Sequence, residues 1–314
     1  MNEQINILFL GGAKRVSLAE LFIEAGKKIG KEINIFSYEL DQFVPIASIG
    51  KIIIGQKWSD PTVSAHLQET IKQHKINIVL PFVDGATIIA SRLKQLVPEV
   101  FIPVSDVATC ERMFDKVKAN EWFEKNNIPV PGHTGLPLIA KPRNGSASKG
   151  IIILRSKEEL NSFHSNFKEE DFLIQNYITA QEYTVDAYVS QAGEAIAIVP
   201  RKRMEVSSGE STKSITAKDE GIIQLCKIII GLGGLKGPIT LQFLREKETQ
   251  KLFIMEINPR FGGGVVTAIR AGADLPMMLL NEYLQKPLTA ATDWEENLIM
   301  TRAFREFFYH ATNN

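Results

Sequence analysis

The residues best suited to chemistry follow an apolar run near the carboxyl end of the chain. The run begins at Phe253 and ends at Arg260, and three glycines follow Phe261. Residues two apart in a strand point to one face, so Glu256 and Asn258 would lie side by side, with Arg260 near them if the strand continues. Oxygen ligands suit a hard cation such as Mg²⁺, and a guanidinium beside it suits a phosphate. The alternative is a strand end whose polar residues meet water.

A second apolar run, Ile239–Leu244, precedes this one, and the polar turn between the two predicts a hairpin. A register centred near Thr249 brings Gln242 opposite Glu256 on one face of the sheet. Gln242, Glu256 and Asn258 would then form one group of oxygen ligands. A shift of one residue would turn Gln242 to the other face.

A loop of small and hydroxyl residues follows an earlier apolar strand that ends at Lys141. The loop contains Ser146 and Ser148, and its successive backbone N–H groups can wrap an anion. Lys141 would meet a phosphate held there. Gly150 is followed by isoleucine rather than by Lys-Ser/Thr, so this is not a P-loop. The alternative is a flexible surface hairpin.

Two further segments carry groups that suit a nucleotide or a charged substrate. The strand Phe172–Gln175 and the connector after it would offer backbone groups to a flat heterocycle, and Glu182 is spaced to accept hydrogen bonds from a ribose. Its alternative is a solvated carboxylate. The basic stretch 200–213, which includes Arg203, reads as a mobile loop that brings cations to a substrate or transferred phosphate. Its alternative is a solvated surface loop.

Alternating strands and helices in the first hundred residues would position an N-terminal site. This alternation predicts a parallel sheet with helices on both faces. The expected strands are Ile5–Leu10, Ile33–Tyr38, Lys51–Ile54, Ile76–Pro81 and Phe101–Val104, and the expected helices are Val16–Ile29, Pro61–His74 and Gly85–Leu96. Ligands of such sheets bind beyond the carboxyl ends of the strands. The polar or flexible residues at those ends are Gly11, Gly12, Lys14, Glu39, Asp41 and Asp84.

The turn after the first strand, Leu10–Arg15, lacks the full G-x-G-x-x-G pattern, which disfavours a dinucleotide site. It is either a tight turn or a set of N–H groups that receives an anionic group of a substrate.

The middle of the chain predicts a helical stretch, Ser105–Asn126, broken near Phe114 and Asp115. The proline-rich connector Asn127–Gly132 is a natural domain boundary. Mostly strands are expected after it. The expected strands are Pro137–Lys141, Gly150–Leu154, Phe172–Gln175, Glu182–Val189, Ala195–Pro200, Ile239–Leu244 and Lys251–Asn258, and the helices are Lys157–Phe167, Gly221–Ile230, Val265–Gly272 and Pro276–Leu284.

Composition excludes several classes of protein. The 314 residues suit two or three compact units, and 44% apolar with 23% charged residues is ordinary for a globular protein. Equal numbers of basic and acidic residues, 36 each, favour neither nucleic acid nor an anionic membrane. Two cysteines, an apolar N-terminal run too short for a signal peptide, and no membrane-spanning stretch predict a soluble cytoplasmic protein. Five scattered histidines argue against structural zinc.

In chain order these pieces resemble the ATP-grasp superfamily, and within it single-module proteins similar to the large chain of carbamoyl-phosphate synthetase. The resemblance covers nearly the whole chain and implies an α/β ATP-grasp fold behind a Rossmann-like domain, with ATP and Mg²⁺ or Mn²⁺ as cofactors. Nucleotide binding is assigned to Lys116, Lys141, Ser146, Ser148, Gln175, Asn176, Tyr177, Ile178, Glu182 and Arg203. The metal ligands would be Gln242, Glu256 and Asn258, and the catalytic residues Lys141 and Arg260.

The resemblance also implies three units. These are a Rossmann-like domain over 1–108, a small lid over 109–176 and a unit with the metal site over 177–314. Two departures from the wider family stand out. Many relatives carry a carboxylate where this chain has Gln242, a glutamine that the carbamoyl-phosphate synthetase branch shares, and the link from Pro131 to Leu138 is shorter than usual.

The implied activity is an ATP-dependent carboxylate–amine ligase of the EC 6.3 type, which forms an acyl phosphate that an amine or similar nucleophile attacks. Its partners would be a small carboxylate and an amine, in a homodimer. The alternative is a nucleotide-binding regulator that has lost turnover, and a dinucleotide-dependent oxidoreductase is a weaker third reading. The sequence does not identify the carboxylate.

Overall fold

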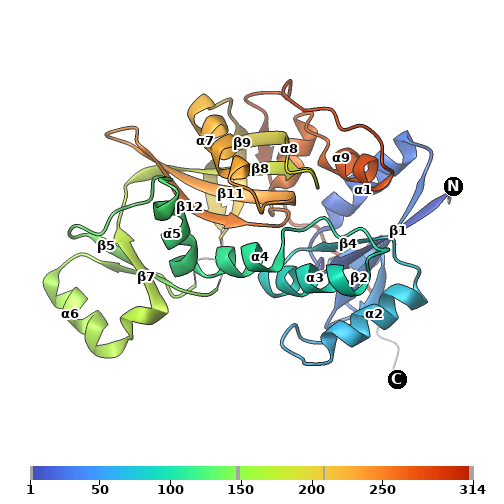
Figure 1. Ribbon diagram of the computed structural model, residues 1–314, viewed down its shortest axis with the longest axis horizontal. Coiled ribbons are helices and arrows are strands. Elements are labelled where there is room, and N and C mark those ends of the chain that lie inside the picture. Colours follow the sequence, from blue (N-terminus) through green and yellow to red (C-terminus); the bar gives the residue numbers. More distant parts are fainter. Residues whose placement is uncertain (1–2, 146–148, 208, 311–314) are drawn as a thin grey trace.

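The computed structural model describes residues 3–145, 149–207 and 209–310. Within these residues the strands form three sheets, of four, six and three strands. Figure 1 shows the four-stranded sheet at one end of the longest axis, the three-stranded sheet at the other, and the six-stranded sheet between them. The chain therefore has the mixed α/β architecture that its alternating elements predict.

The N-terminal sheet is parallel, with the strand order β3-β2-β1-β4. Its strands are β1 (Gln4–Leu10), β2 (Glu32–Glu39), β3 (Lys51–Ile54) and β4 (Ile78–Pro81), and its helices are α1 (Val16–Lys28), α2 (Val63–Gln73) and α3 (Asp84–Leu96). Ile7 and Phe9 share a core with α1, whereas Leu8 and Leu10 share another with α2 and α3. Successive strand residues point to opposite faces. The prediction of helices on both faces is thus confirmed.

The predicted strand Phe101–Val104 is wrong, because only an isolated bridge joins Phe101 to Ile78. The N–H of Phe101 donates to the carbonyl of Asn77 at 2.9 Å, and its carbonyl accepts from the N–H of Val79 at 3.0 Å. Pro103 has no N–H to continue a ladder. The segment therefore touches the edge of the sheet without extending it.

The predicted break in the helical stretch after Ser105 is confirmed at Asp115. Helix α4 (Val107–Phe114) ends there and α5 (Lys116–Lys125) begins. The carboxylate of Asp115 accepts from the N–H groups of Val117 and Lys118, both at 3.1 Å. Such a cap satisfies N–H groups that have no partner within the helix.

The small sheet has the antiparallel order β6-β5-β7. Its elements are β5 (Leu138–Pro142), β6 (Ile152–Leu154), β7 (Phe172–Asn176), helix α6 (Lys157–Asn166) and the short η2 (Glu169–Asp171). Phe163 of α6 packs on Leu138, Ala140, Leu154 and Ile174, which form a core of their own. A separate core is what a distinct lobe requires.

The six-stranded sheet is antiparallel, in the order β12-β11-β8-β9-β10-β13. Its strands are β8 (Ala180–Val189), β9 (Ala195–Ser207), β10 (Glu210–Thr216), β11 (Gly237–Glu246), β12 (Leu252–Asn258) and β13 (Ile299–Thr301). The expected mobile loop over 200–213 is therefore wrong, since β9 and β10 occupy most of it. Arg201 is fully buried there, with its Nε 2.6 Å from Asp186 on β8. This buried pair lets a charged residue lie within a strand.

Helices cover both faces of this sheet. They are α7 (Glu220–Gly231), α8 (Val265–Arg270) and α9 (Leu275–Tyr283). Cys226 of α7 packs with Val185 and Leu241 on one face, whereas Leu279 of α9 joins a core that contains Phe9 and Val199. That last core joins the N-terminal sheet to the six-stranded sheet. The predicted unit boundaries at 108 and 176 stay a proposal.

Both cysteines, Cys110 and Cys226, are buried and unpaired. Among the described residues there is no helix with the length and apolar character that a membrane crossing requires.

Candidate functional site

The hairpin β11–β12 brings the predicted metal ligands together. The predicted register is confirmed, because Gln242 pairs with Glu256. Glu256 Oε1 accepts hydrogen bonds from Gln242 Nε2 at 2.7 Å and from Asn258 Nδ2 at 2.8 Å. The register shifts immediately afterwards, because Phe243 pairs with Ile254, and such bulges re-aim side chains. We call Gln242, Glu256 and Asn258 the oxygen cluster.

The oxygen cluster contains oxygen atoms that could bind Mg²⁺, although its two amide oxygens accept hydrogen bonds from arginines. Gln242 Oε1 accepts from Arg203 at 3.0 Å, and Asn258 Oδ1 accepts from Arg260 at 3.3 Å. Among the described residues no group of three or more His, Cys, Asp or Glu side chains could hold a metal. Mg²⁺ commonly takes one or two carboxylates together with substrate phosphates. The donors therefore fit a cation shared with a bound phosphate, and not one enclosed by protein alone.

Arg203 connects the oxygen cluster to the predicted ribose acceptor. Its guanidinium lies 3.3 Å from the carboxylate of Glu182 and donates to the carbonyl of Gly209 at 2.9 Å. The side chain is 8% exposed, and its buried Nε has no partner among the described residues. A buried guanidinium N–H without a partner is costly. Arg203 thus has donor capacity left for a ligand beside Glu182 and Gln242.

Lys141 reaches the site from the small sheet. Its side chain is buried, and Nζ donates to Gln175 Oε1 at 3.1 Å. Gln175 is held in turn by Asn120 of α5, whose Oδ1 accepts from Gln175 Nε2 at 2.7 Å. Lys141 is therefore held by Gln175 of its own sheet, and Gln175 is held by α5.

Charges around Lys141 show that the two lobes converge. Burial lowers the pKa of Lys141, and the nearby Glu256 acts in the opposite direction. Lys116 lowers this pKa further and Glu182 raises it. The ammonium of Lys141 therefore lies within electrostatic range of carboxylates from the six-stranded sheet.

Lys116 contacts the strand end and the glycine that lead into the loop after Lys141. Lys116 Nζ donates to the carbonyl of Gly145 at 2.7 Å, and the N–H of Lys116 donates to the carbonyl of Arg143 at 3.0 Å. Ser146 and Ser148, predicted to bind phosphate, lie outside the described residues. The start of α5 thus borders the loop next to Lys141.

The predicted base-binding segment makes several internal bonds. The N–H of Asn176 donates to the carbonyl of Gly132 at 2.6 Å, and that of Tyr177 donates to Pro137 at 2.9 Å. Tyr177 is 41% exposed and Ile178 is half-buried. Two N–H groups expected to face a heterocycle therefore bond within the chain.

Arg260 joins the oxygen cluster to the N-terminal sheet. Its Nε and Nη2 donate to Asp84 Oδ1 at 3.1 and 3.0 Å. Asp84 begins α3 just beyond the carboxyl end of β4. The carboxyl end of β4, with Asp84, and the end of β12, with Arg260, thus meet where the four-stranded and six-stranded sheets adjoin.

Three charged residues near Arg260 are absent from the predicted site residues, namely Arg15, Glu210 and Arg302. Arg15 and Glu210 nevertheless lie in segments that are expected from the sequence to meet a substrate, Leu10–Arg15 and 200–213. The carboxylate of Glu210 lies 3.5 Å from Arg15 and 2.6 Å from Arg302. We call Arg15, Arg260 and Arg302 the arginine cluster. Arg15 follows the first glycine turn, which was a weak signal, whereas nothing local distinguishes Glu210 or Arg302.

The glycine turn after β1 does not offer its N–H groups to an outside anion. The N–H groups of Gly12 and Ala13 donate to the carboxylate of Glu39, which also accepts from the hydroxyl of Ser37 at 2.6 Å. Burial raises the pKa of Glu39, and these bonds act against that rise. The N–H groups thus have an internal partner, so the anion-binding interpretation of this turn is wrong.

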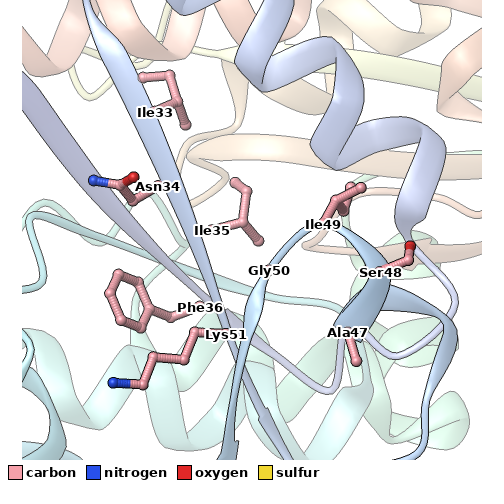
Figure 2. A pocket seen from close by; sticks show the side chains of 9 residues that line it. All are labelled: Ile33, Asn34, Ile35, Phe36, Ala47, Ser48, Ile49, Gly50 and Lys51. Carbon is pink, nitrogen blue, oxygen red and sulfur yellow. The ribbon is translucent and has the colours of Figure 1, made fainter. Parts of the chain in front are cut away.

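A separate hollow of about 470 Å³ lies on the edge of the N-terminal sheet. Figure 2 shows β2 along one wall and residues 47–50 along the other. Strand β3 pairs with β2 only from Phe36 onward, which leaves the hollow beside Ile33 and Ile35. No candidate site residue lines it among the described residues.

Comparison with known proteins finds similar sequences. Residues 168–304 match the protein-family model described as "ATP-grasp in the biosynthetic pathway with Ter operon". A D-alanine–D-alanine ligase of Rickettsia bellii is 23% identical over 83% of this chain and 87% of its own length. A carbamoyl-phosphate synthase of Methanobrevibacter smithii is 22% identical over 60% of this chain and 58% of its own length.

A solved structure extends the likeness to the whole fold. The biotin carboxylase domain of the 2-oxoglutarate carboxylase from Hydrogenobacter thermophilus superimposes with a TM-score of 0.72 at 17% identity. The match covers 94% of this chain and 73% of that one.

Proposed function

We propose that this chain, which is similar to ATP-grasp proteins in sequence and in fold, is an ATP- and Mg²⁺-dependent carboxylate–amine ligase. In this reaction a carboxylate oxygen attacks the γ-phosphorus of ATP, and ADP leaves. An amine or similar nucleophile then attacks the carbonyl carbon of the acyl phosphate, and phosphate leaves. The relative from Rickettsia bellii, a D-alanine–D-alanine ligase, is named for joining two amino acids, which carry a carboxylate and an amine.

One observation carries the proposal, which is the approach of Lys141 to the oxygen cluster from another lobe. The ammonium of Lys141 is buried, and the carboxylate of Glu256 lies close enough to raise the pKa of that ammonium against the lowering effect of burial. An anion chain and a hard cation bound between them would satisfy both groups. A buried lysine has a desolvation cost that such a ligand offsets.

The proposed roles divide by location. Lys116, Lys141, Ser146, Ser148, Gln175, Asn176, Tyr177, Ile178, Glu182 and Arg203 would hold the nucleotide. Gln242, Glu256 and Asn258 would hold Mg²⁺, which when bound would neutralise charge on the phosphates. Lys141 and Arg260 would stabilise the charge that develops on the transferred phosphoryl group. A homodimer remains a proposal.

A regulator that binds nucleotide without turnover is the second candidate. Gln242 supplies an amide where a carboxylate would bind a cation more strongly, and Arg203 and Arg260 engage the amide oxygens of the cluster. This chain would then bind ATP and form no ADP.

The test is ADP formation across amino acids, small carboxylates and ammonia, with ATP binding measured in parallel by calorimetry. The Lys141→Met and Glu256→Gln variants should lose turnover, whereas the exposed controls Lys125→Met and Glu248→Gln should keep it. ATP binding without ADP from any pair would overturn the ligase and favour the regulator. Absence of ATP binding would overturn both.

A further inference from the structure

The arginine cluster lies beside the proposed reaction centre and encloses a carboxylate of the chain itself. Glu210 opens β10, and its two oxygens face Arg15 at 3.5 Å and Arg302 at 2.6 Å. Arg302 also donates to the carbonyl of Gly263, in the glycine run after Arg260. A carboxylate thus occupies a position between two guanidiniums that were brought together from the two ends of the chain.

Glycine at position 263 allows this close approach. A Cβ at Gly263 would lie 2.9 Å from Glu210 Oε1 and 3.1 Å from Arg15 Nη1. Both separations are below ordinary contact distances. Gly263 therefore borders the arginine cluster with backbone atoms alone, which leaves room for Arg15 and Glu210 to approach each other.

The cluster carries more positive charge than its own carboxylates neutralise. Side chains of Arg15, Arg260 and Arg302 are 18%, 15% and 30% exposed, so solvent screens them incompletely. Burial lowers the pKa of Arg15, Glu210 acts against this, and Arg260 and Arg302 lower it further. The opposing carboxylates are Asp84 and Glu210. An additional anion would reduce the repulsion among the guanidiniums.

The location connects this cluster with the nucleotide. Gly209, the residue before Glu210, accepts a hydrogen bond from Arg203, which also donates to Gln242. Arg260 contacts Asn258 on its other side at 3.3 Å. A substrate acid that reached the oxygen cluster would therefore extend toward Arg15 and Arg302.

We infer that Arg15 and Arg302 form a subsite for a second anionic group of the acid substrate, a carboxylate or a phosphate, and that Glu210 occupies this subsite until the substrate displaces it. Guanidiniums bind both kinds of anion through paired hydrogen bonds. The side chain of Glu210 is 47% exposed, so it can turn to water at little cost. The inference rests on the proposed ligase, because it concerns the substrate of that site.

The experiment is calorimetric binding in the presence of Mg²⁺ and a non-hydrolysable ATP analogue. The probes are pairs that differ in one anionic group, namely L-glutamate with L-glutamine, succinate with its monoamide, and O-phospho-L-serine with L-serine. At least one anionic probe should bind about tenfold or more tightly than its counterpart, and Arg302→Gln should remove that preference. The carboxylate and phosphate pairs distinguish the two sources of the second charge.

Two further variants make the test specific. Glu210→Gln should strengthen binding of the preferred anionic probe several-fold, because it removes the internal competitor. Arg305→Gln is the matched control, since Arg305 is 66% exposed and pairs with Glu20 instead, and it should leave binding unchanged. Equal binding of every pair, or equal effects of Arg302→Gln and Arg305→Gln, would overturn the subsite.

Turnover separates failure of the subsite from failure of the ligase. A chain that binds the anionic probes and forms no ADP with any acid retains the subsite and loses the proposed function. A chain that forms ADP equally well with acids that carry one charge retains the function and loses the subsite.

Discussion

The oxygen cluster and the arginine cluster adjoin at Arg260, and they differ in both charge and origin. The oxygen cluster lies on two paired strands and contains one carboxylate with two amides. The arginine cluster gathers Arg15, Arg260 and Arg302 from the two ends of the chain, around Glu210. The first is suited to a cation that carries phosphate, and the second to an anion. An enzyme that transfers a phosphoryl group from Mg²⁺–ATP to an acid has to hold a cation and an anion side by side.

The largest expected effect comes from removing the charge of the oxygen cluster. Glu256→Gln keeps the shape of the side chain but removes its carboxylate, so turnover should fall about 100-fold or more, with the fold retained. Steady-state ADP formation measures this, together with the thermal midpoint. Turnover near the wild-type rate would remove Glu256 from the proposed metal site.

The next largest effect is expected at Lys141. Lys141→Met should weaken ATP binding about 10- to 100-fold, whereas the thermal midpoint should stay the same or rise, because burial of the ammonium costs stability. Calorimetry measures the ATP affinity, and thermal melting measures the midpoint. A large loss of stability with ATP binding intact would make Lys141 a structural residue.

The Gln242→Glu variant is expected to bind the metal ion more tightly. A second carboxylate opposite Glu256 should strengthen Mn²⁺ binding in the presence of ATP by several-fold and lower stability in the absence of metal, because like charges would face each other. Titration with Mn²⁺ in melting experiments measures both. Unchanged Mn²⁺ affinity would separate the oxygen cluster from metal binding.

The smallest effect concerns pH and the arginine cluster. Burial alone would raise the pKa of Glu210, but Arg15 and Arg302 outweigh it and lower that pKa. A carboxyl with a lowered folded-state pKa contributes stability above its unfolded pKa and loses it as pH falls through the folded pKa. The melting temperature of the wild type should therefore fall more steeply in acid than that of Glu210→Gln. Parallel curves would show that the ion pairs do not form in solution.

Much of the oxygen cluster could be predicted from the sequence because its geometry is local. Alternation along one strand put Glu256 and Asn258 on one face, and hairpin arithmetic brought Gln242 opposite Glu256. The helix break near Asp115 could also be predicted from local sequence, and Asp115 is a residue type that favours the N-cap position of the helix that follows it. These features depend on neighbours in sequence or on a single turn.

The arginine cluster could not be predicted, because its contacts join distant parts of the chain. Arg15 and Glu210, or Glu210 and Arg302, have no spacing that indicates a pair. The basic stretch around Arg201 suggests a mobile loop, whereas Arg201 lies buried in β9, paired with Asp186 on the neighbouring strand β8. Such ion pairs depend on which strands become neighbours in the sheet, and the local sequence does not show this.

The most direct test of the proposed ligase is transfer of ¹⁸O from the carboxylate of an acid that supports ADP formation. If the carboxylate oxygen attacks the γ-phosphorus and the nucleophile then displaces phosphate, each phosphate released should carry one labelled oxygen from the acid, and mass spectrometry of the phosphate measures this. Release of ADP with unlabelled phosphate, or no ADP with any acid of the panel, would contradict the proposed acyl-phosphate ligase.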